Sequence, residues 1–362
     1  MDLETILKLR GEPLAGIYLS LTQRCPLHCA HCSTESTLTG EQIASDELVA
    51  FVRSMPYHGT PSLLYFTGGE ALMRPKLIET LTGEAHARSI STVLLTGGFF
   101  LRHSDRAPDR IWSVLASQDH VSLSVDRFHE DEVPRARVLA LLTRLAASGV
   151  DTSVQLTGTN LGDPYIETAI QDIRSRTEGQ TPILVSLLAP VGRAKQLVSA
   201  EPAVDQRVYG EVIAQPCAAA NWPVYTWDGR VTACCNQEVV GRRAPTHLSL
   251  SETPSCTWRE TYVAHSRSDV VKAIRLVGPR QLAALSGGEV RVATANKDYC
   301  STCLRLSDAR WEAAVTSAAR RATREPLASR MEDLLARRYA IHPPGMQPGY
   351  DSLTRVAGGL HS

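Results

Sequence analysis

The chain has 362 residues, and its 38 Lys and Arg residues are balanced by 38 Asp and Glu residues, so the formal net charge is zero. A protein without a net positive field is poorly suited to bind nucleic acid through phosphate contacts, and we expect no nucleic-acid partner. No apolar run reaches the length of a membrane span, and the acidic N-terminus lacks the pattern of a signal peptide. We therefore expect a cytoplasmic protein without membrane association, in which nine cysteines are better explained as metal ligands than as disulfides.

A strand is predicted at residues 16–22, because this segment is rich in β-forming residues and is bounded by Gly and Pro. The segment CPLHCAHC then places Cys25, Cys29 and Cys32 in a CxxxCxxC spacing on the loop that leaves the strand. A [4Fe-4S] cluster normally takes four thiolates. Three thiolates leave one iron open for a ligand that is not protein.

A helix is predicted at residues 45–54, followed by a strand at 63–67 that ends in Gly68, Gly69 and Glu70. Two glycines directly after a strand allow a turn with positive φ and the close approach of a ligand. The carboxylate that follows them can hold an ammonium group. The pairing suits the amine of an amino acid.

Four further strands are predicted at residues 92–96, 121–125, 152–156 and 183–188, with helical segments such as 137–148 between them. Six β-then-α units argue for a parallel sheet with crossover helices. Polar residues directly after the strands are typical of a barrel whose site lies at its C-terminal face. The predicted fold class is α/β, with a partial (β/α)6 TIM-like barrel.

The CxxxCxxC segment after the first strand and the Gly-Gly-Glu segment after the second resemble the radical S-adenosylmethionine (SAM) enzymes. The resemblance implies a [4Fe-4S] cluster held by the three cysteines, with SAM on the open iron and its amine on the Gly-Gly-Glu segment. It also implies an external electron donor, such as flavodoxin or ferredoxin, and cleavage of SAM to a 5′-deoxyadenosyl radical that takes a hydrogen atom from the substrate.

Two later segments resemble parts of the SAM site in this family. Relatives have Thr-Asn-Gly after the third strand, where this chain has Thr96 and two glycines, so the asparagine side chain is missing. The segment from Ser124 to Asp126 resembles the Ser-Leu-Asp found near the SAM ribose, and both side chains suit ribose hydroxyls. An ordinary strand serine and a turn-forming aspartate are the alternative.

The segment 190–194 resembles the Pro-x-Gly-Arg-Ala segment of relatives that carry an extra cluster. The resemblance implies that Arg193 points into the barrel mouth. A permanently charged guanidinium there would act in catalysis by orienting a carboxylate or a substrate hydroxyl.

The other six cysteines follow the predicted barrel. The segment 223–232 predicts a β-hairpin with an Asp-Gly turn, which would bring Cys217 and Cys234 near one another. Together with Cys300 and Cys303, their spacing resembles the twitch form of the SPASM domain. This resemblance implies one auxiliary [4Fe-4S] cluster with four thiolate ligands.

Several alternatives stay open for the cysteines. Either group could instead hold zinc, the first with His28 or His31 as an additional ligand. Cys235 could replace its neighbour Cys234, although the spacing from Gly229 favours Cys234. Cys256 lies in a loop rich in Ser, Thr and Pro, which favours a free thiol.

The predicted organisation is a lead-in at residues 1–15, a barrel at 16–200, a small cysteine-rich α+β domain at 201–305, helices at 306–342 and a flexible tail at 343–362. The length suffices for a barrel and a second, smaller unit.

The predicted reaction is a net two-electron oxidation, because a substrate radical beside a fully thiolate-ligated cluster can lose an electron to it. The favoured substrate is a small molecule, an aminocyclitol or sugar whose carbinol is oxidised in natural-product tailoring. Only a short segment precedes the first strand, whereas many peptide-modifying relatives carry a recognition domain there. The alternatives are a maturase that crosslinks or epimerises a ribosomal peptide, and a zinc-stapled protein without redox chemistry.

Overall fold

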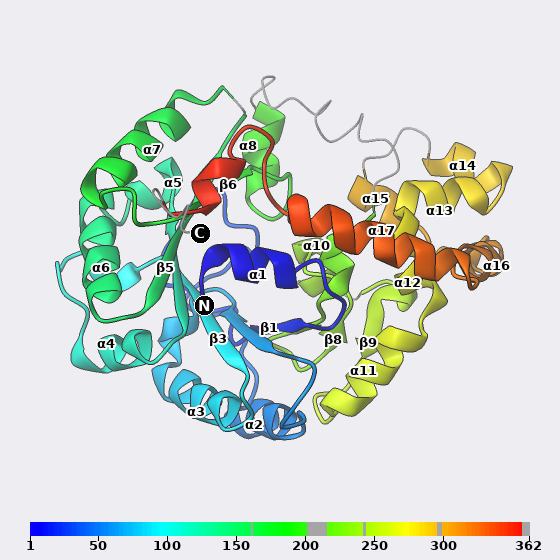
Figure 1. The fold of residues 1–362 in the computed structure, drawn as a ribbon, viewed down its shortest axis with the longest axis horizontal. Coiled ribbons are helices and arrows are strands. Elements are labelled where there is room, and N and C mark those ends of the chain that lie inside the picture. The colour runs from blue at the N-terminus through cyan, green and yellow to red at the C-terminus, as the bar shows by residue number, and fades with distance from the viewer. Residues whose placement is uncertain (161, 201–215, 242–243, 295–298, 357–362) are drawn as a thin grey trace.

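A computed structural model describes residues 1–160, 162–200, 216–241, 244–294 and 299–356 (Figure 1). Six parallel strands are neighbours in chain order and confirm the predicted α/β fold with its parallel sheet. Their bounds are β1 Gly16–Ser20, β2 Leu63–Thr67, β3 Ser91–Thr96, β4 His120–Val125, β5 Asp151–Gly158 and β6 Ile183–Leu187.

Helices connect these strands and cover the outer face of the sheet, as Figure 1 shows for α3, α4, α6 and α7. This arrangement explains why the strands read as nearly continuous apolar runs, since both of their faces are covered. The helices of the barrel are α1 Leu3–Leu9, α2 Ser45–Arg53, α3 Pro75–His86, α4 Asp109–Ala116, α5 Arg127–Glu130, α6 Arg135–Ala147, α7 Pro164–Arg176 and α8 Ala194–Ala200, with 3-10 helices η1 Ala71–Met73 and η2 Phe99–Leu101.

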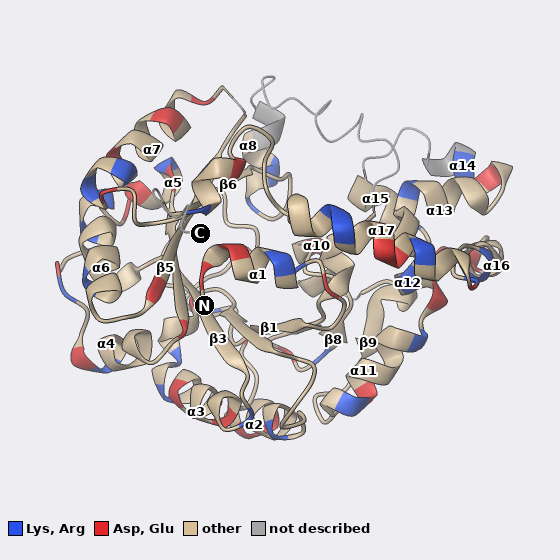
Figure 2. Cartoon of the chain, viewed as in Figure 1, with Lys and Arg blue, Asp and Glu red and all other residues tan. Residues whose placement is uncertain are grey.

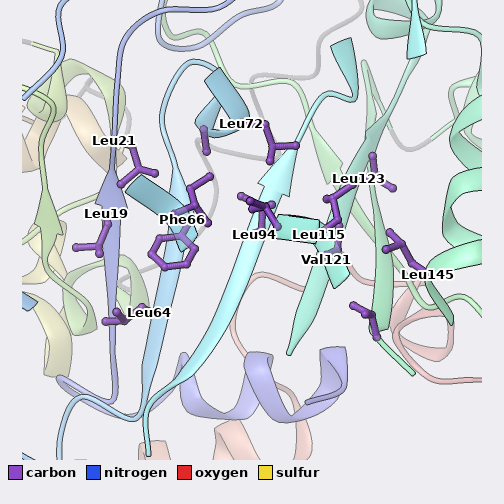
Figure 3. Close-up of a cluster of buried hydrophobic side chains, with 14 of the residues drawn as sticks. Leu19, Leu21, Leu64, Phe66, Leu72, Leu94, Leu115, Val121, Leu123 and Leu145 are labelled. Carbon is purple, nitrogen blue, oxygen red and sulfur yellow. The ribbon is translucent and has the colours of Figure 1, made fainter. Parts of the chain in front are cut away.

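The main core lies between the strands and these helices (Figure 3). Leu19, Phe66 and Leu94 on the strands are fully buried, as are Leu115 of α4 and Leu145 of α6. Burying a side chain of this size contributes about 1.5–3 kcal/mol each. The C-terminal strand ends, where the polar segments lie, therefore rest on a rigid base.

Three short strands extend the same sheet beyond β1, namely β7 Val224–Tyr225, β8 Val231–Thr232 and β9 Ser249–Ser251. β7 pairs with β1 in parallel, and β7 and β8 form the predicted hairpin, with Gly229 at φ +85° in its turn. The cysteine-rich region is thus joined to the barrel through a continuous nine-stranded sheet.

Helices of the cysteine-rich region gather beyond β1, on the right of Figure 1. Many of their apolar side chains form a second core, whereas Trp258, at the start of the helix 258–267, packs in the barrel core. The elements are η3 Ala218–Asn221, α10 Gln237–Val240, η4 Thr246–Leu248, α11 Trp258–Arg267, α12 Asp269–Val277, α13 Pro279–Leu285, α14 Gly288–Thr294, α15 Tyr299–Leu304, α16 Glu312–Ala322 and α17 Leu327–Ile341.

The region predicted to be a flexible tail contains a packed segment. The 3-10 helix η5 Asp351–Thr354 buries Leu353 against the barrel core, and the guanidinium of Arg355 lies 3.0 Å from the carboxylate of Glu4 on α1. Apolar burial and this ion pair hold residues 351–355 against the barrel, whereas the Pro- and Gly-rich composition favoured a loose chain.

Charged side chains of both signs are mixed over the outer helices in the view of Figure 2, in keeping with the zero net charge. Within the described part of the chain, no helix combines the length and the apolar character that crossing a bilayer requires.

Candidate active site

The three N-terminal cysteines lie on the loop that follows β1. Cys25 and Cys29 are buried, whereas Cys32 is partly exposed, and the loop turns so that the Cys32 N–H donates to the Cys29 carbonyl at 3.1 Å. Burial raises the pKa of Cys25 to about 12, and the charges of Glu70, Cys29 and Cys32 add to this rise. The three sulfurs therefore lie near enough to influence one another.

Cys32 differs from Cys25 in its surroundings. Burial opposes its ionisation, but hydrogen bonds from Thr34 and from the backbone at Ser36, together with the charge of Arg193, hold the pKa of Cys32 below its usual range. The Thr34 hydroxyl lies 3.2 Å from the sulfur. These donors favour the thiolate, which is the form that binds iron.

The Gly-Gly-Glu segment after β2 is docked against the start of the cysteine loop. The N–H groups of Gly69 and Glu70 donate to the carbonyls of Thr22 and Arg24 at 2.6 and 2.8 Å. A Cβ on Gly68 would lie 2.5 Å from the Thr22 oxygen, and one on Gly69 would lie 2.5 Å from the Arg24 oxygen. Two glycines are needed here because the two backbones approach so closely.

Glu70 is 1% exposed and connects the ends of β2 and β3. Its carboxylate accepts hydrogen bonds from the Leu72 N–H at 3.1 Å, the Thr96 hydroxyl at 2.9 Å and the Gly97 N–H at 3.1 Å. Burial raises the pKa of Glu70 to about 7, although these hydrogen bonds act in the opposite direction. Thr96 is thereby placed in the site, while the role of Glu70 toward the SAM amine stays a prediction.

Arg193, which follows β6, binds the cysteine loop through hydrogen bonds from its backbone and from its side chain. Its backbone N–H donates to the Cys32 carbonyl at 3.0 Å, and its guanidinium donates to the carbonyls of Cys29 and Ser36 at 3.1 and 3.0 Å. Gly192 has φ +56°, and a Cβ there would lie 2.3 Å from a carbonyl oxygen of the loop. The guanidinium predicted to orient substrate thus binds the backbone of this chain.

Asp126 is 1% exposed, and both of its carboxylate oxygens have partners within the chain. Oδ1 accepts from the N–H groups of Phe128 and His129, which caps α5, and Oδ2 lies 2.7 Å from His129 Nδ1 and 3.3 Å from His31 Nε2. Ser124, on the same strand, is partly exposed. The ribose role predicted for Asp126 and Ser124 stays a prediction, and Asp126 in addition orients two imidazoles.

The carboxylate and the imidazole of this pair stabilise each other's charged forms. Burial alone would lower the pKa of His129, but the charge of Asp126, its hydrogen bond and the Cys29 thiol raise it to about 10. Burial opposes the ionisation of Asp126, yet His129 and His31 hold its pKa well below the usual range. The segment from Asp126 to His129 extends the resemblance to radical SAM enzymes, but no role was predicted for His129, although it lies in the first turn after an aspartate N-cap.

The C-terminal cysteines come together from three segments. Cys217 precedes η3, Cys234 follows β8 and Cys303 lies on α15, and all three pack against the second core. Burial raises the pKa of Cys234 and of Cys303 well above the usual range, and the neighbouring thiols add to both shifts. Cys300, one turn before Cys303, is exposed, and its charge reaches Cys303.

The remaining cysteines face other surroundings. The sulfur of Cys235 accepts a hydrogen bond from Arg10 at 3.3 Å and packs against a small cluster distinct from the second core. Cys256 is buried in the barrel core. His247, which the sequence analysis did not consider, places Nε2 3.7 Å from the Cys303 sulfur.

The donor geometry bears on the choice between zinc and iron-sulfur clusters. A tetrahedral zinc with Zn–S bonds of about 2.3 Å brings its sulfurs to within about 3.8 Å of one another. Among the described residues, only His31, Asp126 and His129 form a group of three or more candidate ligands with all ligand atoms within 4.8 Å. Thiolates suit both zinc and iron-sulfur clusters, and neither cysteine group meets this limit among the described residues.

Residues 19–173 match the Radical SAM superfamily. This segment contains the cysteine loop, the Gly-Gly-Glu segment and strands β2 to β5. The chain therefore carries a radical SAM domain, a class of domain that binds a [4Fe-4S] cluster and SAM.

Curated relatives align with part of the chain. The PqqA peptide cyclase of Streptomyces rochei is 37% identical over 124 residues, which are 32% of this chain and 30% of that protein. The GTP 3′,8-cyclase of Listeria welshimeri is 29% identical over 120 residues, which are 32% of this chain and 34% of that protein. The chain thus matches about a third of the length of these relatives.

A solved structure, that of native anSMEcpe with bound AdoMet and Cp18Cys peptide, has a similar fold. It aligns with a TM-score of 0.51 and 12% identity over 84% of this chain and 99% of that chain. At this identity the similarity concerns the fold alone.

Proposed function

We propose that the chain is a radical SAM enzyme that modifies a peptide by abstracting a hydrogen atom and forming a crosslink. The observation that carries the proposal is that one sheet supports both cysteine groups. β1 leads into the cysteine loop, and it pairs directly with β7 of the hairpin that precedes Cys234. Because β7 runs parallel to β1 and β8 runs antiparallel to β7, Cys217 and Cys234 lie toward the opposite end of β1 from the cysteine loop. An electron from a substrate radical formed at the first site would cross this distance within one protein.

When bound, the first cluster and SAM supply the abstraction of a hydrogen atom from an unactivated C–H bond. The chain's own residues hold that site in shape. Gly69 and Glu70 bind the start of the cysteine loop through their backbone, and Arg193 binds its end. Such fixed positioning supports the aim at a single substrate hydrogen.

An auxiliary [4Fe-4S] cluster held by Cys217, Cys234, Cys300 and Cys303 is part of the proposal. Four thiolates complete the ligands of such a cluster, which suits electron transfer rather than SAM binding. An external one-electron donor, such as flavodoxin or ferredoxin, would start the reaction at the first site.

A peptide is the preferred substrate class because relatives of the cysteine loop and the following strands include PqqA peptide cyclases. This reverses the order expected from the sequence, where the small molecule came first. The oxidation of an aminocyclitol or sugar carbinol is the second candidate, and it is favoured by the comparable match to GTP 3′,8-cyclases, whose name refers to a small molecule.

The decisive experiment reconstitutes the protein anaerobically, counts iron and adds SAM and dithionite. About eight irons per chain and release of 5′-deoxyadenosine are expected for two clusters. A colourless protein that binds zinc and does not cleave SAM would end the proposal. About four irons, unchanged when Cys217 and Cys300 are replaced by Ala, would remove the auxiliary cluster alone.

The substrate class is tested separately by mass spectrometry. Short peptides encoded beside the gene for this chain are incubated with the reconstituted protein, in parallel with aminocyclitols. A peptide that loses two hydrogen atoms supports crosslinking. The same loss from an aminocyclitol, with peptides unchanged, would replace the peptide by the small molecule.

A further inference from the structure

The helix α17 leaves a band of apolar side chains open to solvent. Leu327, Leu334 and Ile341 are 53%, 60% and 68% exposed, and they follow one another at intervals of seven residues. Such residues lie on one side of a helix, because seven residues complete almost two turns. The half-buried side chains of Met331 and Leu335 lie beside them, so the band is wider than a single row. We call these five side chains the apolar band of α17.

A different side of α17 holds the helix on the rest of the chain. Ala328 is fully buried, and a Cβ on Gly11, which follows α1, would lie 2.8 Å from Cδ2 of Tyr339. The ammonium group of Lys272 on α12 lies 3.6 Å from the carboxylate of Glu332. Ala328, Glu332 and Tyr339 share one side of the helix, since they recur at intervals of four and seven residues. The apolar band is therefore presented by an anchored helix.

Arginines accompany the apolar band on its solvent side. Arg330 and Arg337 are exposed along one edge of the band, and Arg338 is exposed within it. None of these three guanidinium groups forms an ion pair with a residue in the part of the chain that the structure describes. The exposed carboxylate of Asp333 lies beyond this edge, further round the helix. The band thus combines apolar area with an excess of positive charge.

A second copy of the chain fits this band poorly. If two α17 helices paired in parallel along their bands, Arg338 of one copy would face the same residue of the other. In an antiparallel pair centred on Leu334, Arg330 of one copy would face Arg337 of the other. Like charges at the facing and flanking positions of paired helices disfavour association. The charges therefore call for a partner with acidic side chains.

A membrane surface also fits the band poorly. A helix that lies in a membrane interface turns its whole apolar face toward the lipid. The apolar residues of α17 are instead divided between the band and the packed side, where Ala328 and Tyr339 contact the rest of the chain. A narrow partner that lies along the band does not require α17 to leave its place.

We propose that the apolar band of α17 binds an acidic amphipathic helix of the peptide substrate, at a segment separate from the residues that react. Amphipathic helices bind such surfaces through apolar anchors at helical spacing. Carboxylates beside those anchors would pair with Arg330 and Arg337. The 15 residues of α17 span about 22 Å, which allows contact with about four turns of a partner helix. The inference rests on the proposed peptide substrate.

The test is fluorescence anisotropy with the whole reconstituted protein and a labelled synthetic peptide. This probe has about 20 residues, with Leu at intervals of three and four residues and Glu at the flanking positions. One control peptide has the same residues in an order without period, and the other has Lys in place of Glu. We expect the wild type to bind the probe at least about tenfold more tightly than either control peptide.

Two variants of α17 locate the binding of the probe. Leu334→Ser removes the central anchor of the band and should weaken binding by about tenfold or more. Arg337→Glu should weaken it by about fivefold, and by more at low salt, because it reverses a charge at the edge of the band. Leu285→Ser on α13 is the matched control, since Leu285 is 44% exposed and lies outside α17. All three side chains are exposed, so none of these changes opens a cavity in the core.

Three outcomes would overturn the proposal. The first is a wild type that does not bind the probe, or that binds it no more tightly than Leu334→Ser and Arg337→Glu do. The second is a dimeric wild type beside a monomeric Leu334→Ser in sedimentation, which would assign the band to a second copy. The third is binding to vesicles of phosphatidylserine and phosphatidylcholine that Leu334→Ser loses while the probe stays unbound, which would assign the band to a membrane.

SAM cleavage without peptide, measured in the same samples, separates this inference from the proposed function. Release of 5′-deoxyadenosine should be equal in the wild type and in Leu334→Ser, because α17 contributes no residue to the N-terminal cysteine loop. No release from the wild type would overturn the proposed function, whereas the binding of the probe decides the role of α17.

Discussion

The two cysteine sites of this molecule are held in place in different ways. The N-terminal loop is fixed mainly through its backbone. The backbone N–H groups of Gly69 and Glu70, after β2, donate to carbonyls of this loop. The carboxylate of Glu132, after β4, accepts from the N–H of His28 in the loop. The guanidinium of Arg193, after β6, donates to two further carbonyls of the loop. The shape of this loop therefore depends on the strand ends of the barrel more than on its own side chains.

The C-terminal site depends on side-chain burial instead. Cys217, Cys234 and Cys303 come from three separated segments, and they pack against a small apolar core that includes Val271, Ile274 and Val315. From this difference we expect the first site to keep its shape when one thiol is lost. The second site should depend more on the metal or cluster that its thiols bind.

The largest expected effect is the loss of SAM cleavage in Cys25→Ser. Removing one of three ligands abolishes the cluster that the reaction needs, so release of 5′-deoxyadenosine should fall by more than about 10³-fold, the scale seen when an essential catalytic group is removed. The second site should keep about four irons. Iron content and nucleoside release are the measurements.

Cys256→Ser is the matched control for that experiment, because Cys256 is also a buried thiol but lies in the loop before α11, outside both predicted ligand sets. Cleavage should persist in this variant. Retention of normal SAM cleavage in Cys25→Ser would remove the N-terminal cluster from the mechanism.

The second prediction compares two adjacent cysteines. Cys234 packs against the second core, as do Cys217 and Cys303, whereas Cys235 packs against a different cluster and accepts a hydrogen bond from Arg10. Cys234→Ser should therefore lose about four irons per chain, while Cys235→Ser should lose none. In both variants SAM cleavage should continue, since the first site is intact. Loss of iron in Cys235→Ser alone would exchange the two assignments.

The third prediction concerns the hydrogen bonds by which Arg193 holds the N-terminal cysteine loop. Arg193→Lys replaces a planar group that binds two carbonyls with a single ammonium that can reach one of them at a time. Loss of a supporting contact of this kind typically costs 10–100-fold in metal affinity, so iron should leave the first site that much faster under a chelator.

Arg174→Lys is the control for this substitution, because Arg174 is exposed on α7 and lies outside both sites. Iron loss at the same rate in both variants would show that the hydrogen bonds of the Arg193 guanidinium are not needed to retain iron at the first site.

The sequence predicted most strands and helices of the barrel and the loop that carries the N-terminal thiols. Strand and helix patterns are local, and the spacing of Cys25, Cys29 and Cys32 can be read without any tertiary information. The glycines after β2 were also predictable as a close approach, although they approach the backbone of Thr22 and Arg24 within the chain. Local patterns thus located the close approach of two backbones at the ends of β1 and β2.

The partners of the polar side chains were less predictable. Arg193 was expected to face the substrate, and Asp126 was expected to face the ribose, but the first binds backbone carbonyls and the second holds His129 and His31. The pairing of β7 with β1 joins residues about two hundred positions apart and has no local signal. The partners of these side chains and strands depend on which distant segments the folded barrel brings together.

The smallest expected effect is a pH dependence of stability that comes from Glu70. Its pKa is raised from 4.5 to about 7 by burial. Because the folded chain binds this proton more tightly than the unfolded chain, the stabilisation is fully present below about pH 4.5 and is lost as the pH rises through 7. A shift of this size corresponds to about 3 kcal/mol between the two limits.

The measurement is chemical unfolding of the iron-free chain at pH 5 and pH 8, compared with Glu70→Gln. The carboxamide of the variant has one oxygen, which can accept from the N–H of Leu72 or of Gly97 but not from both, at either pH. The difference between wild type and variant therefore isolates the titration of Glu70 from that of other groups. The advantage of the wild type should shrink from pH 5 to pH 8. A constant difference would mean that the carboxylate is already ionised in the folded chain, and the N-terminal loop would then be docked against a buried charge.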